Sequence, residues 1–130
     1  MGDCQDFDCS SDFVTVSDDP LLDWGAAQSF TIELWFNATN VASRNKVMIG
    51  RDEAGGTHWW LGLNQNNGYA NWNQLDANRN GVAVTGSTSL NDGQWHHLVA
   101  VRDESLNQNR LYVDGALVGT AYHDYTAGFE

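Results

Sequence analysis

Basic residues and cysteines are scarce in this chain of 130 residues. Lys46 is its only lysine, and six basic residues stand against seventeen acidic ones, so the formal net charge is −11. Phosphate binding depends on clustered Lys and Arg, so this composition argues against nucleic acid as a partner and against an anionic membrane surface. The excess carboxylates either keep the chain in solution or supply oxygen ligands to a cation such as Ca²⁺.

Long apolar runs are also missing. No segment approaches the length that spans a bilayer, so we expect no membrane insertion. The first ten residues, MGDCQDFDCS, have neither the basic region nor the apolar stretch of a signal peptide. Either a signal peptide was removed, or export uses another route, or the protein is a component of a virion.

Cys4 and Cys9 are the only cysteines. Two cysteines in a neighbourhood poor in histidine do not make a zinc site, which needs four ligands. Their spacing suits a small disulfide loop if the two Cβ atoms face each other, and a pair of free thiols is the alternative. An oxidising location outside the cell would favour the disulfide.

Helical signals are absent as well, since no amphipathic run of ten residues or more is found. One proline, 13 glycines and short alternating segments predict a single all-β domain over residues 1–130. Pro20 is well placed to begin one helical turn over Leu21 and Leu22. The predicted strands are 4–8, 13–16, 30–37, 46–51, 59–63, 69–73, 81–85, 95–102, 110–113 and 116–119.

The stretch WHHLVAVRDESLNQNRLYVDGALVGT, residues 95–120, carries the clearest pattern. Its first strand places Trp95, His97, Val99 and Val101 on one face and His96, Leu98, Ala100 and Arg102 on the other. A polar loop follows, and the Asp114-Gly115 pair predicts a type I′ turn between two antiparallel strands. We expect the two histidines to hold the end of the first strand through hydrogen bonds to the backbone.

This stretch, together with DFVTV at 12–16, LLD at 21–23 and SFTIELWF at 29–36, resembles the laminin-G-like, concanavalin A-like lectin domains, most closely their bacterial and phage-associated branch. The resemblance covers most of the chain in the expected order. It implies an antiparallel two-sheet β-sandwich, a jelly roll, which usually serves as a binding module. Within that fold, 30–37 is predicted to be a central strand with both faces covered.

Domains that this chain resembles usually add one or two strands after the Asp-Gly hairpin. The residues after Tyr122 predict no such strand, so the sandwich is expected to lack its last strand or strands. An unpaired strand edge is a template for another chain. Either the sequence is truncated, or a neighbouring subunit completes the sheet and produces a homo-oligomer or polymer.

A partial calcium motif begins at Asp76. The sequence DANRNG places Asp76, Asn78 and Asn80 at alternate positions before a glycine, and the Val82 carbonyl would be the next ligand. The pattern fails at Ser87, where an EF-hand has its bidentate Glu. The alternative is an Asn-Gly turn between two strands, with its polar side chains in solvent.

The acidic N-terminus offers a second calcium proposal. The resemblance implies a structural Ca²⁺ where the first strands meet the last ones, and Asp8 and Asp12 are the best ligands by position. Separately, Asn37 opens an N-glycosylation sequon, Asn-Ala-Thr, at the end of its strand.

Aromatic and amide residues predict a sugar-binding surface between residues 59 and 74. Aromatic faces stack on the C–H faces of a pyranose, and amide groups bond to its hydroxyls. Adjacent Trp59 and Trp60 point to opposite faces of a strand, so one of them faces the core. The alternative is that all these aromatic residues fill the core. The predicted ligand-binding residues are Trp60, Asn64, Tyr69, Asn71 and Asn73.

Catalysis is not predicted. Glu33 is the only glutamate in a predicted strand, whereas a glycosidase needs two positioned carboxylates, and no nucleophile elbow accompanies the histidines. The sequence therefore predicts a non-enzymatic extracellular or cell- or particle-surface module for recognition or adhesion. It would bind a glycan or glycoprotein, with Ca²⁺ as a structural ion. The alternative is a subunit of an extracellular filament, fibre or virion, assembled by completing its β-sheet with a neighbour.

Overall fold

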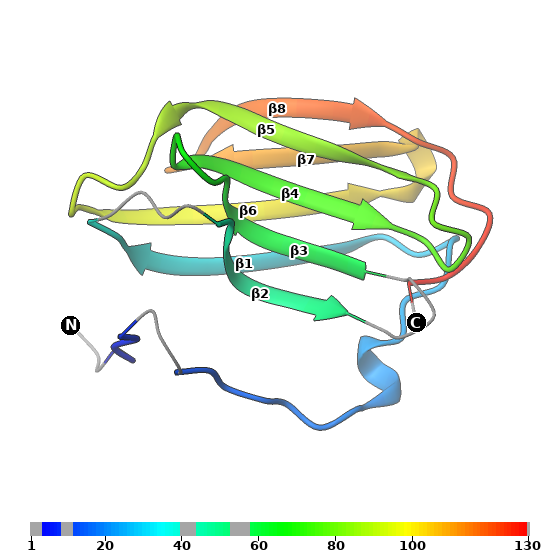
Figure 1. The fold of residues 1–130 in the computed structure, drawn as a ribbon. Coiled ribbons are helices and arrows are strands. Elements are labelled where there is room, and N and C mark those ends of the chain that lie inside the picture. The colour runs from blue at the N-terminus through cyan, green and yellow to red at the C-terminus, as the bar shows by residue number, and fades with distance from the viewer. Residues whose placement is uncertain (1–3, 9–11, 40–43, 53–57, 130) are drawn as a thin grey trace.

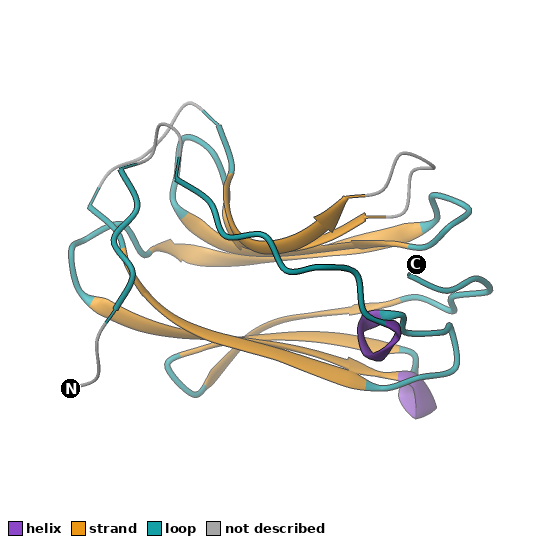
Figure 2. Cartoon of the chain, turned by 90° about the horizontal axis from the view of Figure 1, so that it is seen from below, coloured by secondary structure: helices purple, strands orange, loops and turns teal. Residues whose placement is uncertain are grey.

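Two antiparallel four-stranded sheets pack face to face in the computed structural model, which describes residues 4–8, 12–39, 44–52 and 58–129 (Figures 1 and 2). The first sheet has the order β1-β6-β7-β8, made of β1 (Phe30–Asn37), β6 (Trp95–Asp103), β7 (Gln108–Val113) and β8 (Ala116–Tyr122). The second has the order β2-β3-β4-β5, made of β2 (Lys46–Asp52), β3 (His58–Leu63), β4 (Tyr69–Leu75) and β5 (Gly81–Ser89). The predicted all-β sandwich is confirmed.

The core lies between the sheets and follows the period of two. In β3, Trp59, Leu61 and Leu63 point inward and are buried, whereas Trp60 takes the opposite face. In β1, Ile32 and Phe36 are buried, as the alternation of that segment predicts. Each large apolar side chain removed from water in this way contributes about 1.5–3 kcal/mol.

Residues 95–120 fold as their sequence pattern predicts. Leu98, Ala100 and Arg102 of β6 all face inward and are almost fully buried. The β7–β8 turn has positive φ at both central residues, 51° at Asp114 and 80° at Gly115, as a type I′ turn requires.

The structure corrects one strand position. We expected β1 to be central, but it is an edge strand of the first sheet, with β6 as its single neighbour within the described residues. Trp35 on its outer face is therefore 65% exposed. The predicted helical turn after Asp19 is confirmed as the 3₁₀-helix η1 (Pro20–Leu22), in which Asp19 accepts a hydrogen bond from the Leu21 N–H at 2.9 Å. A second 3₁₀-helix, η2 (Glu104–Leu106), lies between β6 and β7.

The two strands predicted near the N-terminus are wrong. Residues 4–8 and 12–19 contain no strand, and Phe13, Val14 and Val16 are more than 70% exposed. Alternating apolar residues form a strand only where another strand pairs with their backbone, and none of the described strands does so here. The segment instead runs along the side of the sandwich where β1 and β2 lie (Figures 1 and 2).

The residues between β8 and the end of the described chain at Phe129 form no strand. They nevertheless close one end of the core, because Tyr125 and Phe129 are buried there. Two backbone hydrogen bonds hold this segment, one from the Phe129 N–H to the Trp24 carbonyl and one from the Ala77 N–H to the Gly128 carbonyl.

Among the described residues, no helix has the length and apolar character required to cross a membrane.

Candidate functional site

The predicted sugar-binding residues lie together on the outer face of the second sheet. Trp60 in β3 and Asn73 in β4 are directly paired across the two strands, and both side chains are half-buried. Asn71 and Tyr69 follow at alternate positions of β4, so they share the face of Asn73. Asn64 directly follows β3, where its N–H donates to the Tyr69 carbonyl at 2.8 Å. The structure thus brings the predicted set onto one surface.

On this face Trp60 lies between Gly50 of β2 and Asn73 of β4. Beyond Asn73 the next residue in the row is Ala83 of β5. A Cβ atom at position 50 would lie 2.9 Å from the Trp59 carbonyl oxygen and 3.0 Å from the Trp60 Cβ, so the position is too crowded for a side chain. The sheet bends so that its outer face is concave in Figure 2. The indole of Trp60 therefore lies on a concave face, with glycine as its neighbour on one side.

Asn71 differs from the rest of the set. Its side chain is buried, with 4% of the residue exposed, and its Oδ1 accepts a hydrogen bond from the Thr85 hydroxyl at 2.7 Å. We expected its amide to face a sugar, whereas the structure uses its oxygen to bind a neighbouring strand. Asn71 therefore links β4 to β5, and little of its side chain is left accessible to a ligand.

The Asp76 motif forms a tight turn between β4 and β5. The Asp76 Oδ1 accepts the N–H groups of Asn78 and Asn80, both at 2.9 Å, and the Asp76 N–H donates to the Asn80 carbonyl. Asp76 is fully buried, whereas Asn78 and Asn80 are exposed. Val82 lies beyond the turn in β5, opposite Gln74. The Asp76 Oδ2 is buried without a hydrogen-bond partner, which leaves one carboxylate oxygen for a cation.

Asp8 and Asp12 contact each other, because the Asp8 N–H donates to the Asp12 Oδ2 at 2.8 Å, and both are exposed. Residues 4–8 and 123–129 lie at opposite ends of the molecule (Figures 1 and 2), so Asp8 and its partner Asp12 do not meet the described C-terminal residues. No group of three or more His, Cys, Asp or Glu side chains within the described ranges is arranged to hold a metal ion.

Two other predicted positions lie at the surface. Asn37 is exposed at the end of β1, and its Nδ2, the atom that carries a glycan in a used sequon, donates to the Gly93 carbonyl at 2.7 Å. Cys4 is exposed, while Cys9 lies outside the described residues. The proposed disulfide therefore stays a prediction.

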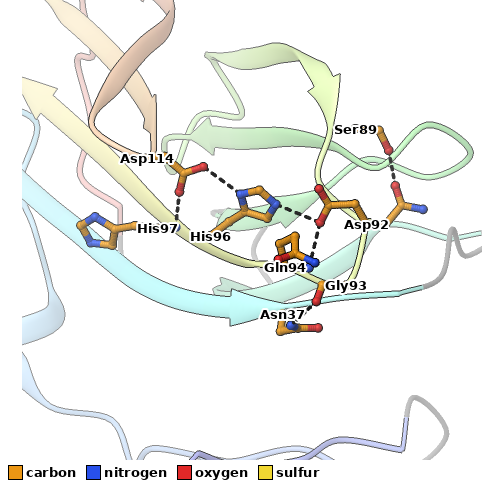
Figure 3. Close-up of polar contacts among 9 residues, drawn as sticks. Asn37, Ser89, Asp92, Gly93, Gln94, His96, His97 and Asp114 are labelled. Carbon is orange, nitrogen blue, oxygen red and sulfur yellow. Dashed lines mark hydrogen bonds and ion pairs between the residues drawn. The ribbon is translucent and has the colours of Figure 1, made fainter. Parts of the chain in front are cut away.

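A polar cluster that the sequence did not predict lies at the end of the sandwich near Asn37 (Figure 3). The His96 Nδ1 is 2.8 Å from the Asp114 Oδ2, and the His96 Nε2 is 3.2 Å from the Asp92 Oδ1. The expectation that His96 binds the backbone is wrong, since its ring bridges two carboxylates. The cluster lines a cavity of about 230 Å³ whose apolar wall includes Leu90 and Val118.

The electrostatics of this cluster favour the charged histidine. Burial alone would lower the pKa of His96, but hydrogen bonds to Asp114 and Asp92 outweigh it, so the pKa is raised. The pKa of Asp114 is lowered by the His97 N–H and by His96, and that of Asp92 by the Gln94 N–H and by His96. The sequence signal for this cluster is the strand register, because pairing Leu98 with Val113 places Asp114 beside the start of β6.

The outer face of the first sheet carries a second exposed aromatic group. The Trp35 ring stacks on His97 with centroids 4.7 Å apart and an interplanar angle of 14°. The His97 Nε2 lies 3.3 Å from the Glu33 Oε2. This group faces away from the core and from the His96 cluster, because His97 and His96 point to opposite faces of β6.

Comparison with known proteins agrees with this architecture. The family model described as the concanavalin A-like lectin/glucanases superfamily matches residues 8–128. No protein of curated function matches the sequence.

Solved structures with the same fold are distant in sequence. The binding domain of Paraclostridial Mosquitocidal Protein 1 superposes with a TM-score of 0.70 at 13% identity, over 86% of this chain and 29% of that one. Mouse laminin alpha1 chain domains LG4-5 give a TM-score of 0.61 at 23% identity, over 83% and 27%. The CBM40 of the Ruminococcus gnavus IT-sialidase bound to alpha2,3 sialyllactose gives 0.61 at 14%, over 82% and 56%. The chain thus spans between about a quarter and three fifths of these structures, and the likeness shows the fold alone.

Proposed function

Because this chain belongs to the concanavalin A-like lectin/glucanases superfamily, we propose that it is a non-catalytic recognition module that binds glycans at a cell or particle surface. The observation that carries this proposal is the position of Trp60. Its side chain points to the outer, concave face of the second sheet, between Asn73 of β4 and Gly50 of β2.

The chemistry of this surface suits a sugar ring. An indole offers a flat apolar face to the C–H groups of a pyranose, and an amide both donates to and accepts from hydroxyl groups. Asn64 and Tyr69 extend the polar rim at the β3–β4 turn. A ligand site of this kind combines an apolar platform with a few polar groups that fix orientation.

Charge indicates the class of glycan. The formal net charge of −11 repels acidic sugars at a distance, and the proposed ligand set of Trp60, Asn64, Tyr69 and Asn73 contains no basic side chain that would pair with a carboxylate. We therefore favour neutral glycans over sialylated ones, although a CBM40 of the same fold has been solved with sialyllactose bound.

A glycan array containing neutral and sialylated sugars tests this proposal, followed by calorimetry on the best binder. Trp60→Ala should weaken binding at least tenfold, because the platform is lost. Trp35→Ala is the matched control, since Trp35 is exposed on the outer face of the opposite sheet, and it should leave affinity unchanged. An array without binders, or equal affinity of wild type and Trp60→Ala, would exclude this face as a glycan site.

Calcium is retained in the proposal as a structural ion at Asp76. A buried carboxylate oxygen without a partner is costly, and a cation bound there would offset that cost. The fit is partial, because the side chains of Asn78 and Asn80 are exposed while Asp76 is buried. Calorimetric titration with Ca²⁺ should show binding, and EGTA should lower the melting temperature of wild type but not of Asp76→Asn. The absence of heat and of any melting shift would exclude the ion.

The structural-subunit alternative is supported by the open edge of β1. Its outer side has no partner strand among the described residues, and the nearby Phe13, Val14 and Val16 expose apolar side chains. Both features are those of a sheet that pairs with another chain. Sedimentation over a range of concentrations distinguishes the two functions, because polymers with no glycan binding would select the subunit. A monomer at all concentrations would remove this alternative.

A further inference from the structure

The His96 ring is held between two segments that are distant in sequence. Asp114 belongs to the β7–β8 turn, and Asp92 belongs to the loop between β5 and β6, residues 90–94 (Figure 3). Each ring nitrogen lies within hydrogen-bond distance of one carboxylate oxygen, at 2.8 and 3.2 Å. The ring is therefore the bridge between the loop and the turn.

Counting protons shows which form of the ring makes this bridge. A neutral imidazole has one N–H donor and one acceptor nitrogen, and an ionised carboxylate is an acceptor only. A neutral ring could therefore bond to one of the two carboxylates, while its other nitrogen would face an oxygen that repels it. The imidazolium donates from both nitrogens, so only the protonated ring satisfies the observed geometry.

Among the described residues, no charged group other than Asp92 and Asp114 pairs with His96. On the side of β1 the ring packs against Phe36, with centroids 5.7 Å apart. From β5 and its loop the facing titratable group is Asp92, and from the β7–β8 turn it is Asp114. Glu33 pairs with His97 on the opposite face of β6.

We propose that His96 is a protonation-dependent clasp that fastens the 90–94 loop to the β7–β8 turn when its ring is charged and releases one of the two when the ring is neutral. The clasp spans the cavity that Asp92, His96 and Asp114 line together. Its closed form requires a charged ring and ionised carboxylates. It therefore holds at pH values above the lowered pKa of the two aspartates and below the raised pKa of His96.

The 90–94 loop is a junction of the fold, which gives the clasp a wider effect. The Leu90 N–H donates to the Gly68 carbonyl in the β3–β4 turn, and the Gly93 N–H donates to the Ala38 carbonyl after β1. Asp92 itself orders the loop by accepting the Gln94 N–H at 2.9 Å. Loss of the clasp therefore loosens a loop that contacts both sheets.

Nuclear magnetic resonance of the whole chain tests the clasp without any ligand. In wild type, nitrogen-15 shifts of the His96 ring should show both nitrogens protonated below the His96 pKa, and that pKa should lie above the ordinary value of about 6.5. The hydrogen-exchange protection of the Gln94 amide should fall several-fold as pH rises through that pKa. Asp114→Asn should lower the pKa of His96.

Two substitutions provide the controls. His96→Gln should give low protection at Gln94 that no longer changes around the His96 pKa, whereas His97→Gln should leave the wild-type profile intact, because His97 faces the other side of β6. A His96 pKa at or below the ordinary value, or one unaffected by Asp114→Asn, would overturn the clasp. If His96→Gln fails to fold, the wild-type titration and Asp114→Asn still decide the question.

Discussion

The guanidinium carbon of Arg102 lies 4.9 Å from the centroid of the Tyr125 ring, and both residues are buried. A cation over an aromatic face in a desolvated place contributes about 2 kcal/mol. The Tyr125 hydroxyl also donates to the Gln74 carbonyl at 3.2 Å, which joins the C-terminal segment to the second sheet. One end of the core is thus held by a polar contact as well as by apolar packing.

Alkaline pH should lower the free energy of unfolding through Tyr125 at this end of the core. Burial raises the pKa of Tyr125 to about 12, an effect that the charge of Arg102 opposes. The unfolded chain releases the tyrosine proton near its usual pKa of about 10, before the folded chain does, so this stability is lost as pH rises from about 10 to about 12. Urea unfolding across this range should show the loss. Tyr125→Phe keeps the ring over Arg102 and should remove this component of the loss, at a cost of about 1 kcal/mol at neutral pH.

The adjacent tryptophans of β3 should respond very differently to truncation. Trp59 is buried with 5% exposure, so Trp59→Ala should cost about 3–5 kcal/mol. Trp60 points to the outer face, and Trp60→Ala should cost much less. Denaturant unfolding of both variants measures the difference, and acrylamide should quench the Trp60 emission more than that of Trp59. Equal losses would mean that Trp60 is a packing residue and not a platform.

Gly119 in β8 should tolerate no side chain. A Cβ atom there would lie 2.7 Å from the Val84 Cγ1 on the facing strand β5, which is a steric clash. Gly119→Ala should therefore destabilise the fold by about 1–3 kcal/mol. Combining it with Val84→Ala frees the space, so the double variant should be more stable than the sum of the single losses predicts. Strict additivity would show that the two sheets do not approach as described.

Arg51 of β2 should hold in place the segment that precedes β1. Its guanidinium contacts Asp23 at 2.5 Å and Asp18 at 3.1 Å, and it donates to the Leu22 carbonyl at 3.3 Å. Arg51→Gln should cost about 1 kcal/mol and should make residues 12–19 more sensitive to limited proteolysis. Arg44→Gln is the control, since Arg44 is exposed before β2. Unchanged proteolysis would show that η1 holds its place without this arginine.

The sequence predicted the strands best where alternation was strong and a turn was encoded locally. The Asp114-Gly115 hairpin and the inward face of Phe30–Asn37 needed only the pleat and turn chemistry. Phe13–Val16 has a similar apolar pattern and yet no partner among the described strands, which alternation alone does not reveal. The edge position of β1 was missed for the same reason, because pairing is decided by contacts far away in sequence.

The candidate site was predicted in outline. Alternation placed Trp60 and Asn73 on one face, but the burial of Asn71 depends on Thr85 in a third strand. The His96 bridge joins residues from a loop, a strand and a turn, so no local sequence motif predicts it. Adjacent histidines suggested one shared role, whereas the pleat sends His96 to Asp114 and His97 to Trp35.

The contact between Phe129 and Trp24 has a consequence for biosynthesis. Phe129 is fully buried, and it joins residues that leave the ribosome more than a hundred positions apart. Because β1 also pairs with β6, the nascent chain cannot complete this core before Phe129 has been synthesised. Its exposed apolar strands would then depend on chaperones, or on the repulsion among its many carboxylates, until the last residues of the core emerge.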